Sequence, residues 1–330
     1  MESTRNRLIH ILNKNEGYQS GQELSDQLGI SRTAVWKHMK ELEKDGYEIE
    51  AVQRKGYRIV SSPDKISENT IQWGLKTKWM AGQLHHFEEV SSTQEIAHQL
   101  AKQGKPHGTV VIADQQLSGK GRMERPWDSP KGKGIWMSML LRPKLPPIQA
   151  PQLTLLTATV LAEVIEQKTG LKPQIKWPND ILIQHKKMAG ILTEMQAEQD
   201  QIQYVVIGTG LNINQKAEDI AQEIHYKATS LLMETQEEWG IQDFIQSLLV
   251  QFEETYDRYI EEGFQHVKQK WETYGYKIGE EVEITTLRKS WKATLLGIEP
   301  DGALRARDRE GNEEKLYSAE IHWGEGGYHA

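Results

Sequence analysis

The hydrophobic pattern of this chain of 330 residues changes twice along its length, and these two changes limit the folds available to it. Residues 1–60 carry apolar side chains at helical spacing. From residue 63 to 275, strand-like and helix-like segments alternate, which is typical of a mixed α/β domain. Residues 276–330 form short strands separated by turns. We therefore predict an α/β (α+β) multidomain protein with domains at 1–62, 63–275 and 276–330.

Composition is ordinary for a soluble globular protein, with 37% hydrophobic and 26% charged residues. The chain has no cysteine, which excludes disulfides, thiol nucleophiles and Cys-ligated metal sites and suits a reducing compartment. The start, residues 1–7, lacks an apolar signal core, and the apolar run 135–141 is too short to span a bilayer. We expect a cytoplasmic protein with no membrane partner.

The front domain has the signals of a winged helix-turn-helix. Ser20 and Glu23 form a capping box that begins a second helix, Gly29 ends that helix, and Ser31 caps a third. Two helices therefore meet across a turn of a few residues. Residues 47–59 then alternate as two strands around a turn, which predicts a wing. An amphipathic helical dimerisation module is the alternative.

A DNA-binding surface follows from the charges of this domain. The protein has a net charge of −7, so binding to DNA requires a local basic patch. The third helix and the wing tip supply one, and we expect DNA contacts from Ser31, Arg32, Thr33, Trp36, Lys37, Lys40, Arg54 and Lys55. In a major groove, Arg32, Thr33 and Trp36 would lie near base edges, whereas Lys37 and the two wing cations would meet phosphates.

The segment 118–127 combines two glycines with Lys120, Arg122 and Arg125 and ends in a proline and a tryptophan. Freed backbone amides and cations suit an anion such as phosphate. The segment is neither a Walker loop nor a dinucleotide fingerprint, because the required residues are absent. A solvated basic loop is the alternative interpretation.

Three further motifs follow in order: Lys176-Trp177-Pro178-Asn179-Asp180, then residues 187–194 (KMAGILTE), then residues 208–214 (GTGLNIN). With the glycine loop, they resemble the biotin protein ligases. With the front domain added, nearly the whole chain is similar to the bacterial bifunctional biotin ligases and biotin-operon repressors. The resemblance implies a central domain of the biotin/lipoate ligase type, and the C-terminal pattern of short strands favours an SH3-like β-barrel over an extra hairpin packed on the central domain.

The resemblance also implies site residues. Those for biotin are Ser92, Thr93, Gln94, Gln116, Lys120, Gly121, Arg122 and Lys187. Those for ATP or the adenylate are Gly119, Arg122, Arg125, Trp127, Asn179, Asp180, Lys187 and Asn212. Arg122 and Lys187 are the catalytic candidates, and Asp180 is the candidate Mg²⁺ ligand and general base.

Several of these residues also have simpler interpretations, and two depart from the family pattern. Ser92 or Thr93 suits a helix cap, and Asn212 suits a turn. Gln94 stands where the family usually has asparagine. Lys120 replaces an arginine, which keeps the charge but loses the bidentate geometry of a guanidinium.

The implied reaction joins biotin and ATP, with Mg²⁺, into biotinyl-5′-AMP. The biotin then passes to a lysine of the biotin carboxyl carrier protein of acetyl-CoA carboxylase and of other biotin-dependent carboxylases. The resemblance further implies a homodimer that forms with the adenylate as corepressor and binds operator DNA of the biotin genes. The alternatives are a non-catalytic biotin-sensing transcription factor and a ligase for lipoate or another short acid.

Overall fold

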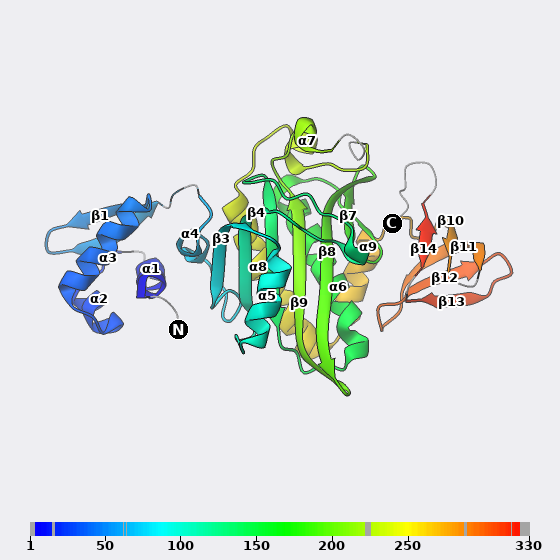
Figure 1. Ribbon diagram of the computed structural model, residues 1–330, viewed down its shortest axis with the longest axis horizontal. Coiled ribbons are helices and arrows are strands. Elements are labelled where there is room, and N and C mark those ends of the chain that lie inside the picture. The colour runs from blue at the N-terminus through cyan, green and yellow to red at the C-terminus, as the bar shows by residue number, and fades with distance from the viewer. Residues whose placement is uncertain are drawn as a thin grey trace.

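Three groups of helices and strands follow one another along the longest axis of the molecule in chain order (Figure 1). The computed structural model describes residues 4–14, 17–61, 63, 65–221, 226–286, 289–317 and 319–323. A helical domain with a two-stranded wing comes first, a mixed α/β domain lies in the middle, and an antiparallel β domain comes last. The predicted fold class is therefore confirmed.

The front domain contains α1 (Thr4–Lys14), α2 (Gly21–Leu28), α3 (Arg32–Lys44), β1 (Glu48–Val52) and β2 (Gly56–Ser61). Both halves of the predicted capping box are present at the start of α2, and Gly29 ends that helix in the left-handed conformation, with φ of 68°. Buried side chains from all three helices form a core separate from that of the central domain.

The central domain is built on a seven-stranded sheet with the order β3-β4-β5-β9-β8-β7-β6. Only β3 and β4 pair in parallel; the other neighbours are antiparallel. The strands are β3 (Leu84–Val90), β4 (Thr109–Gln116), β5 (Gly134–Leu141), β6 (Gln174–Lys176), β7 (Asp180–Ile183), β8 (Lys186–Glu198) and β9 (Gln201–Asn212). Every residue of β5 is buried, as its apolar pattern on both faces predicts.

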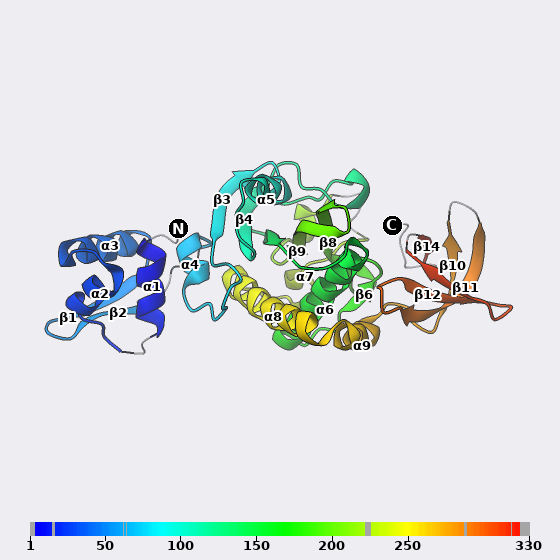
Figure 2. The ribbon, with the colours of Figure 1, turned by 90° about the horizontal axis from the view of Figure 1, so that it is seen from below.

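Helices cover the two faces of this sheet unequally (Figure 2). The long helices α6 (Ala150–Thr169) and α8 (Ile241–Glu262), with α9 (Gln265–Tyr274), lie on one face and contribute to the largest core. On the other face, α5 (Thr93–Lys102) packs on the sheet through a smaller cluster that includes Ala97, Leu140 and Val206. The rest of that face is left to the glycine loop, and this open half of the sheet is where the site forms.

Helix α6, with the turn before it, is long and strongly apolar. By length and composition alone, the segment Pro147–Thr169 could cross a membrane. Its most apolar window is 78% buried inside the protein, between the central sheet and α8. Burial of this extent is that of a core helix, which is apolar all round because protein surrounds it.

Short elements join the domains and complete the central one: α4 (Glu68–Gln72), η1 (Arg122–Glu124), η2 (Pro147–Gln149), η3 (Ala217–Asp219) and α7 (Leu231–Thr235). Helix α4 links the first two domains. Gln246 of α8 donates its side-chain amide to the carbonyls of Ile71 and Trp73, at 2.9 and 2.6 Å. The Trp73 ring in turn meets Tyr47 of the front domain edge-on, with 6.4 Å between centroids.

The C-terminal domain is an antiparallel sheet with the order β13-β12-β11-β10-β14. Its strands are β10 (Glu281–Thr285), β11 (Ser290–Ile298), β12 (Leu304–Asp308), β13 (Glu313–Leu316) and β14 (Glu320–His322), of which the last was not predicted. The domain is tied to the β6–β7 hairpin of the central domain. Tyr276 N donates to Ile175 O at 2.9 Å, and Trp177 Nε1 donates to Gly302 O at 3.4 Å.

Candidate active site

A cavity of about 850 Å³ lies over the uncovered half of the sheet. Its floor comes from β5, β8 and β9, and the N-terminal turn of α5 closes one end. The glycine loop 118–127 and the β6–β7 hairpin form further walls, and Thr285, Tyr317 and Trp323 of the C-terminal domain complete the lining. Two domains therefore contribute to the lining of this site.

Glycines on the floor make room for the side chain of Trp127. A Cβ on Gly210 would lie 2.4 Å from Trp127 Nε1, and one on Gly190 would lie 3.1 Å from the same ring. Both distances are shorter than ordinary van der Waals contact. The indole therefore lies flat against backbone, and Lys187 Nζ lies 5.1 Å from the ring centroid, within cation–π range.

The α5 end of the cavity is polar and tightly hydrogen bonded. Ser92 caps α5 through Gln94 N at 3.2 Å, as a helix cap requires. Gln116 Oε1 accepts from Thr93 N at 2.9 Å, and Gln116 Nε2 donates to Ser129 Oγ at 2.9 Å. Because each of these side chains is held by at least one neighbour, this end of the cavity is rigid before any ligand enters.

Cations and one carboxylate define the opposite end. Lys187 Nζ lies 2.8 Å from Asp180 Oδ1. Arg122 donates to Asn179 Oδ1 at 3.3 Å, while Asn179 Nδ2 donates to Ile191 O at 2.9 Å and fixes the hairpin tip on β8. Lys120 pairs with acidic side chains next to the loop, with Nζ 3.1 Å from Glu124 Oε2 and 3.7 Å from Glu95 Oε1. This end can therefore hold an anion between Lys187 and Arg122.

Behind the hairpin lies Lys176, only 5% exposed. Burial lowers the pKa of Lys176 to about 8, because the surrounding protein solvates an ammonium group poorly, while nearby Asp180 partly opposes this shift. The ammonium group lies 5.5 Å from the ring centroid of Trp323. Lys176 thus joins the hairpin to the C-terminal domain.

Comparisons with known proteins agree with this geometry. Residues 86–212 match the model of the biotin/lipoate A/B protein ligase family, residues 4–58 match an HTH domain, and residues 277–322 match the biotin protein ligase C-terminal domain. The bifunctional ligase/repressor BirA of Bacillus spizizenii is 47% identical over 326 residues, which cover 98% of this chain and 100% of that protein. The chain belongs to the bifunctional biotin ligase/repressor family.

More distant relatives match the ligase in part. Escherichia coli BirA is 34% identical over 212 residues, which cover 63% of each chain. The structure of the Aquifex aeolicus biotin protein ligase in complex with biotin and ATP aligns with a TM-score of 0.64 at 29% identity, covering 73% of this chain and 99% of that one.

Most of the predicted site residues of the ligase lie together in this cavity. Those that line it are Ser92, Thr93, Gln94, Gln116, Lys120, Gly121, Arg122, Arg125, Trp127, Asn179, Asp180 and Lys187. Gly119 belongs to the loop but does not line the cavity, and a Cβ on it would lie 2.5 Å from Trp127 O. Asn212 does not line the cavity; its side chain donates to Thr229 O at 3.0 Å and accepts from Gln215, so it holds the segment after β9.

Sequence analysis of the ligase missed several lining residues. Ser138 is fully buried and lies between Thr93 and Gln94, and as the only polar side chain of β5 it could have been recognised from the sequence. Ser129, which does not line the cavity but accepts from the lining residue Gln116 at 2.9 Å, was missed too. The contributions of Tyr317 and Trp323 had no local signal, because they depend on how the domains pack.

The predicted DNA-contacting residues lie on one domain of the ligase and are all exposed. Trp36 is 52% exposed, which is unusual for so large an apolar ring and leaves it available for contact. Ser31 uses its hydroxyl to cap α3 through Ala34 N, and Lys40 pairs with Glu43. Arg32, Lys37 and the wing residues remain the strongest candidates.

Proposed function

We propose that the cavity activates biotin as biotinyl-5′-AMP at the expense of ATP and transfers it to a lysine of a biotin carboxyl carrier protein. One observation carries this proposal: the cavity has a rigid polar end and a cationic end, and the two are joined by a floor of glycines. A molecule with a polar head, an apolar tail and a terminal carboxylate fits this order.

The first step is attack of the biotin carboxylate on the α-phosphorus of ATP, with pyrophosphate as leaving group. Two anions approach each other in this step, so cations must lie between them. Lys187 is positioned for that role by its pairing with Asp180, and Arg122 lies on the neighbouring wall. Enclosure by the glycine loop and the C-terminal domain limits hydrolysis of the mixed anhydride.

In the second step the ε-amine of the carrier lysine attacks the acyl carbon and AMP leaves. Asp180 is the carboxylate nearest to this end of the cavity and is the candidate base for the attacking amine. Mg²⁺ is compatible with the same corner, since it needs only one or two protein oxygens when phosphates supply the others. Asn179 and Asp180 would hold it, and it would neutralise phosphate charge when bound.

Adenylation is tested by biotin-dependent exchange of labelled pyrophosphate into ATP, with lipoate and octanoate as parallel acids. We expect exchange with biotin alone. Exchange with lipoate instead would identify the other ligase class, and absence of exchange with every acid would identify a biotin sensor.

Lys187→Ala should reduce this exchange at least a hundred-fold, because a charge-assisted contact to the reacting anion is lost. Lys186→Ala is the matched control, since the neighbouring residue of β8 does not line the cavity. Equal rates in the two variants would remove Lys187 from the mechanism.

We also propose that the adenylate-bound protein dimerises and represses transcription of biotin genes, and that the carrier protein and the second protomer use the same face. The support is the edge of β8. Strand β7 pairs with β8 only as far as Gly190, and among the described strands none pairs with that edge beyond it. An open edge of this kind accepts a strand from another chain.

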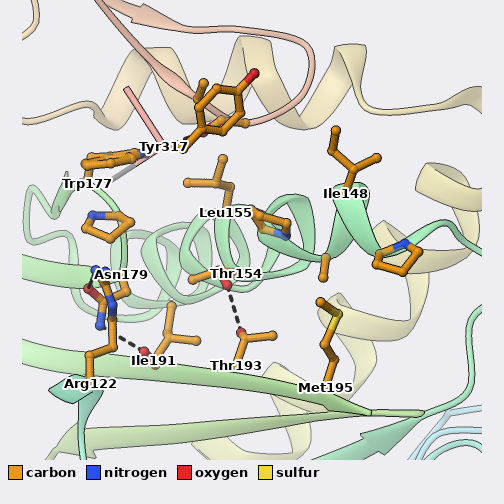
Figure 3. A pocket seen from close by; sticks show the side chains of 16 residues that line it. Arg122, Ile148, Thr154, Leu155, Trp177, Asn179, Ile191, Thr193, Met195 and Tyr317 are labelled. Atoms are coloured by element: carbon orange, nitrogen blue, oxygen red, sulfur yellow. Dashed lines mark hydrogen bonds between the residues drawn. The ribbon is translucent and has the colours of Figure 1, made fainter. Parts of the chain in front are cut away.

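Beside this edge is a groove of about 400 Å³ (Figure 3). Exposed apolar side chains line it, among them Ile148, Met195 and Tyr317, which are 66%, 43% and 60% exposed. Arg122 and Asn179 lie at its other end, so the groove leads into the active site. A carrier lysine that follows this groove would reach the adenylate.

Repression is tested by a gel-shift assay with operator DNA, with and without biotin and ATP. We expect binding that strengthens with the adenylate. Binding that is equal with and without these substrates would contradict the corepressor role, and absence of binding would contradict the repressor role.

A further inference from the structure

A chain of hydrogen bonds crosses the polar end of the cavity and leaves it on the far side. Thr93 Oγ1 lies 2.8 Å from Ser138 Oγ. Ser138 Oγ donates to Gln94 Oε1 at 3.1 Å, and Gln94 Nε2 donates to Glu194 Oε2 at 2.9 Å. His98 Nε2 lies 3.1 Å from the same oxygen of Glu194. The chain thus runs from the cavity to partly exposed side chains at the middle of α5.

The first three members of this chain are buried and line the cavity. Thr93, Gln94 and Ser138 are 3%, 6% and 0% exposed, whereas Glu194 does not line the cavity and lies partly in solvent. Glu194 occurs in the motif 187–194, yet the reaction described above does not use it. Its contacts therefore require a separate explanation.

The order of donors and acceptors follows from three acceptors on one side of Gln94. An ionised carboxylate only accepts hydrogen bonds, and the carbonyls of Val206 and Leu192 also accept from Gln94 Nε2, at 3.3 and 3.4 Å. The NH₂ group of Gln94 therefore turns toward Glu194, which makes the shortest of the three contacts and the one to a charged group, and the carbonyl turns toward Ser138. Ser138 then gives its single proton to Gln94, and Thr93 gives its proton to Ser138 or to Gln116, whose Oε1 lies 3.1 Å away. All these protons are committed within the protein, and the oxygens face the cavity with lone pairs.

The side chains of Thr93, Ser138 and Gln94 can therefore accept hydrogen bonds from a ligand but cannot donate any to it. The charge of Glu194 strengthens the effect, because a hydrogen bond to an ion polarises the next bond in a chain. A cyclic urea has two N–H donors that match such a floor, whereas a dithiolane ring or an alkyl chain has none.

We propose that Glu194 is a positioning residue that orients the Thr93–Ser138–Gln94 chain, and that it thereby selects an acid whose head group donates N–H. The inference rests on the proposed function and adds the origin of its selectivity. Gln94 is needed for it, because the one methylene by which glutamine exceeds asparagine carries the amide from α5 to β8. Gly208 completes the arrangement, since a Cβ there would lie 2.6 Å from Gln94 Oε1.

The test is Glu194→Gln in the full chain. Glutamine keeps the size of the side chain but removes its charge and offers an NH₂ group as well as an oxygen. The shortest and charged acceptor of Gln94 Nε2 is then lost, and only the two longer contacts to backbone carbonyls still favour the same direction. The KM for biotin in pyrophosphate exchange should rise about ten-fold, since a hydrogen bond to a charged group is lost. The KM for ATP should stay within two-fold.

Selectivity provides a readout that a merely structural role would not change. Biotin methylated on one ureido nitrogen lacks one donor, so the ratio of its KM to that of biotin should be smaller in Glu194→Gln than in the wild type. Gln94→Asn should reduce the same ratio. Glu198→Gln is the control, because it removes a charge from the same strand without contact to the cavity.

An unchanged KM for biotin in Glu194→Gln, an equal rise for biotin and ATP, or an unchanged selectivity ratio would each overturn this inference. Measurements on the wild type distinguish failure of this inference from failure of the proposed function. If the wild type shows no biotin-dependent exchange, the proposed function fails; if it does and Glu194→Gln behaves like Glu198→Gln, only the role of Glu194 fails.

Discussion

Single residues decide how the cavity is filled before a ligand arrives. Trp127 lies on Gly190 and Gly210 with no space for a β-carbon beneath it. The Trp127 ring can occupy this position only because Gly190 and Gly210 have no side chain. Such a requirement leaves no trace in hydrophobic pattern or charge, yet it fixes the aromatic wall next to Lys187.

Gly210→Ala tests this arrangement, because its methyl group would lie 2.4 Å from Trp127 Nε1 and must displace the indole. Strain of this kind costs about 1–3 kcal/mol. We expect kcat/KM for biotin in exchange to fall about ten-fold or more. Gly17→Ala is the control, since nothing lies within 4 Å of that position. Wild-type kinetics in Gly210→Ala would show that Trp127 is free to lie elsewhere.

Lys176 gives the protein a pH dependence of its own. Burial lowers the pKa of this group to about 8, from an ordinary value of 10.5. Below pH 8 it is charged in both the folded and unfolded states, so burial of the charge destabilises the fold. Between pH 8 and 10.5 the unfolded chain holds more protons, and this contribution to stability rises with pH.

Lys176→Met should therefore raise the free energy of unfolding at pH 7 relative to the wild type. The difference should shrink by on the order of 2 kcal/mol between pH 7 and pH 10. Denaturant unfolding at several pH values measures it. Lys172→Met, which changes an exposed lysine of the preceding segment, serves as control. A difference that stays constant over this range would contradict the lowered pKa.

At the scale of elements, strand β8 connects chemistry with recognition. Lys187 lies near its start, Glu194 holds Gln94 from outside the cavity, and Met195 lies on the groove beside the open edge. One continuous strand therefore carries the anion contact, the proposed selectivity residue and the proposed docking edge.

Met195→Glu should weaken adenylate-dependent dimerisation at least ten-fold, because like charges from two protomers would meet across an apolar contact. Sedimentation with biotin and ATP present measures this. Gln196→Glu adds the same charge to the opposite face of the strand and should have little effect. Full dimerisation of Met195→Glu would place the interface elsewhere.

Elements with strong local signals were predicted well. The capping box at Ser20 and the helix end at Gly29 both formed where expected. The three-residue strand β14 was not predicted, because it is too short to have a period and pairs only through tertiary contacts.

Site residues that depend on tertiary contacts were not predicted either. The resemblance located residues whose type is fixed by chemistry, such as Arg122 and Lys187. It did not locate Ser138 or Trp323, which reach the cavity through sheet register and domain packing. Asn212 ends β9, but its side chain makes its contacts within the protein and does not line the cavity.

At the scale of the whole molecule, the C-terminal domain belongs to the active site. Gly302 lies against α6, where a Cβ would approach Leu155 to 3.1 Å, and its carbonyl accepts from Trp177. Its φ of 89° is in the left-handed region, where other residues are strained.

Gly302→Ala should therefore reduce exchange activity about ten-fold through displacement of this domain from the hairpin. Gly311→Ala is matched, since its φ of 91° brings the same strain at a turn with nothing within 4 Å. Both variants should lose similar stability, on the order of 1 kcal/mol, but only Gly302→Ala should lose activity. Equal exchange activity in Gly302→Ala and Gly311→Ala would show that the contact between the C-terminal domain and the hairpin is not needed for catalysis.

The junction at α4 has a consequence for how such proteins arise. The front domain has its own core and is joined to the rest by one short helix, the Trp73 ring and side-chain amide contacts from Gln242 and Gln246 of α8. None of the residues that line the active-site cavity comes from it. A gene fusion or loss at this point would leave the catalytic half intact, so regulation can be gained or shed over evolution without redesign of the enzyme.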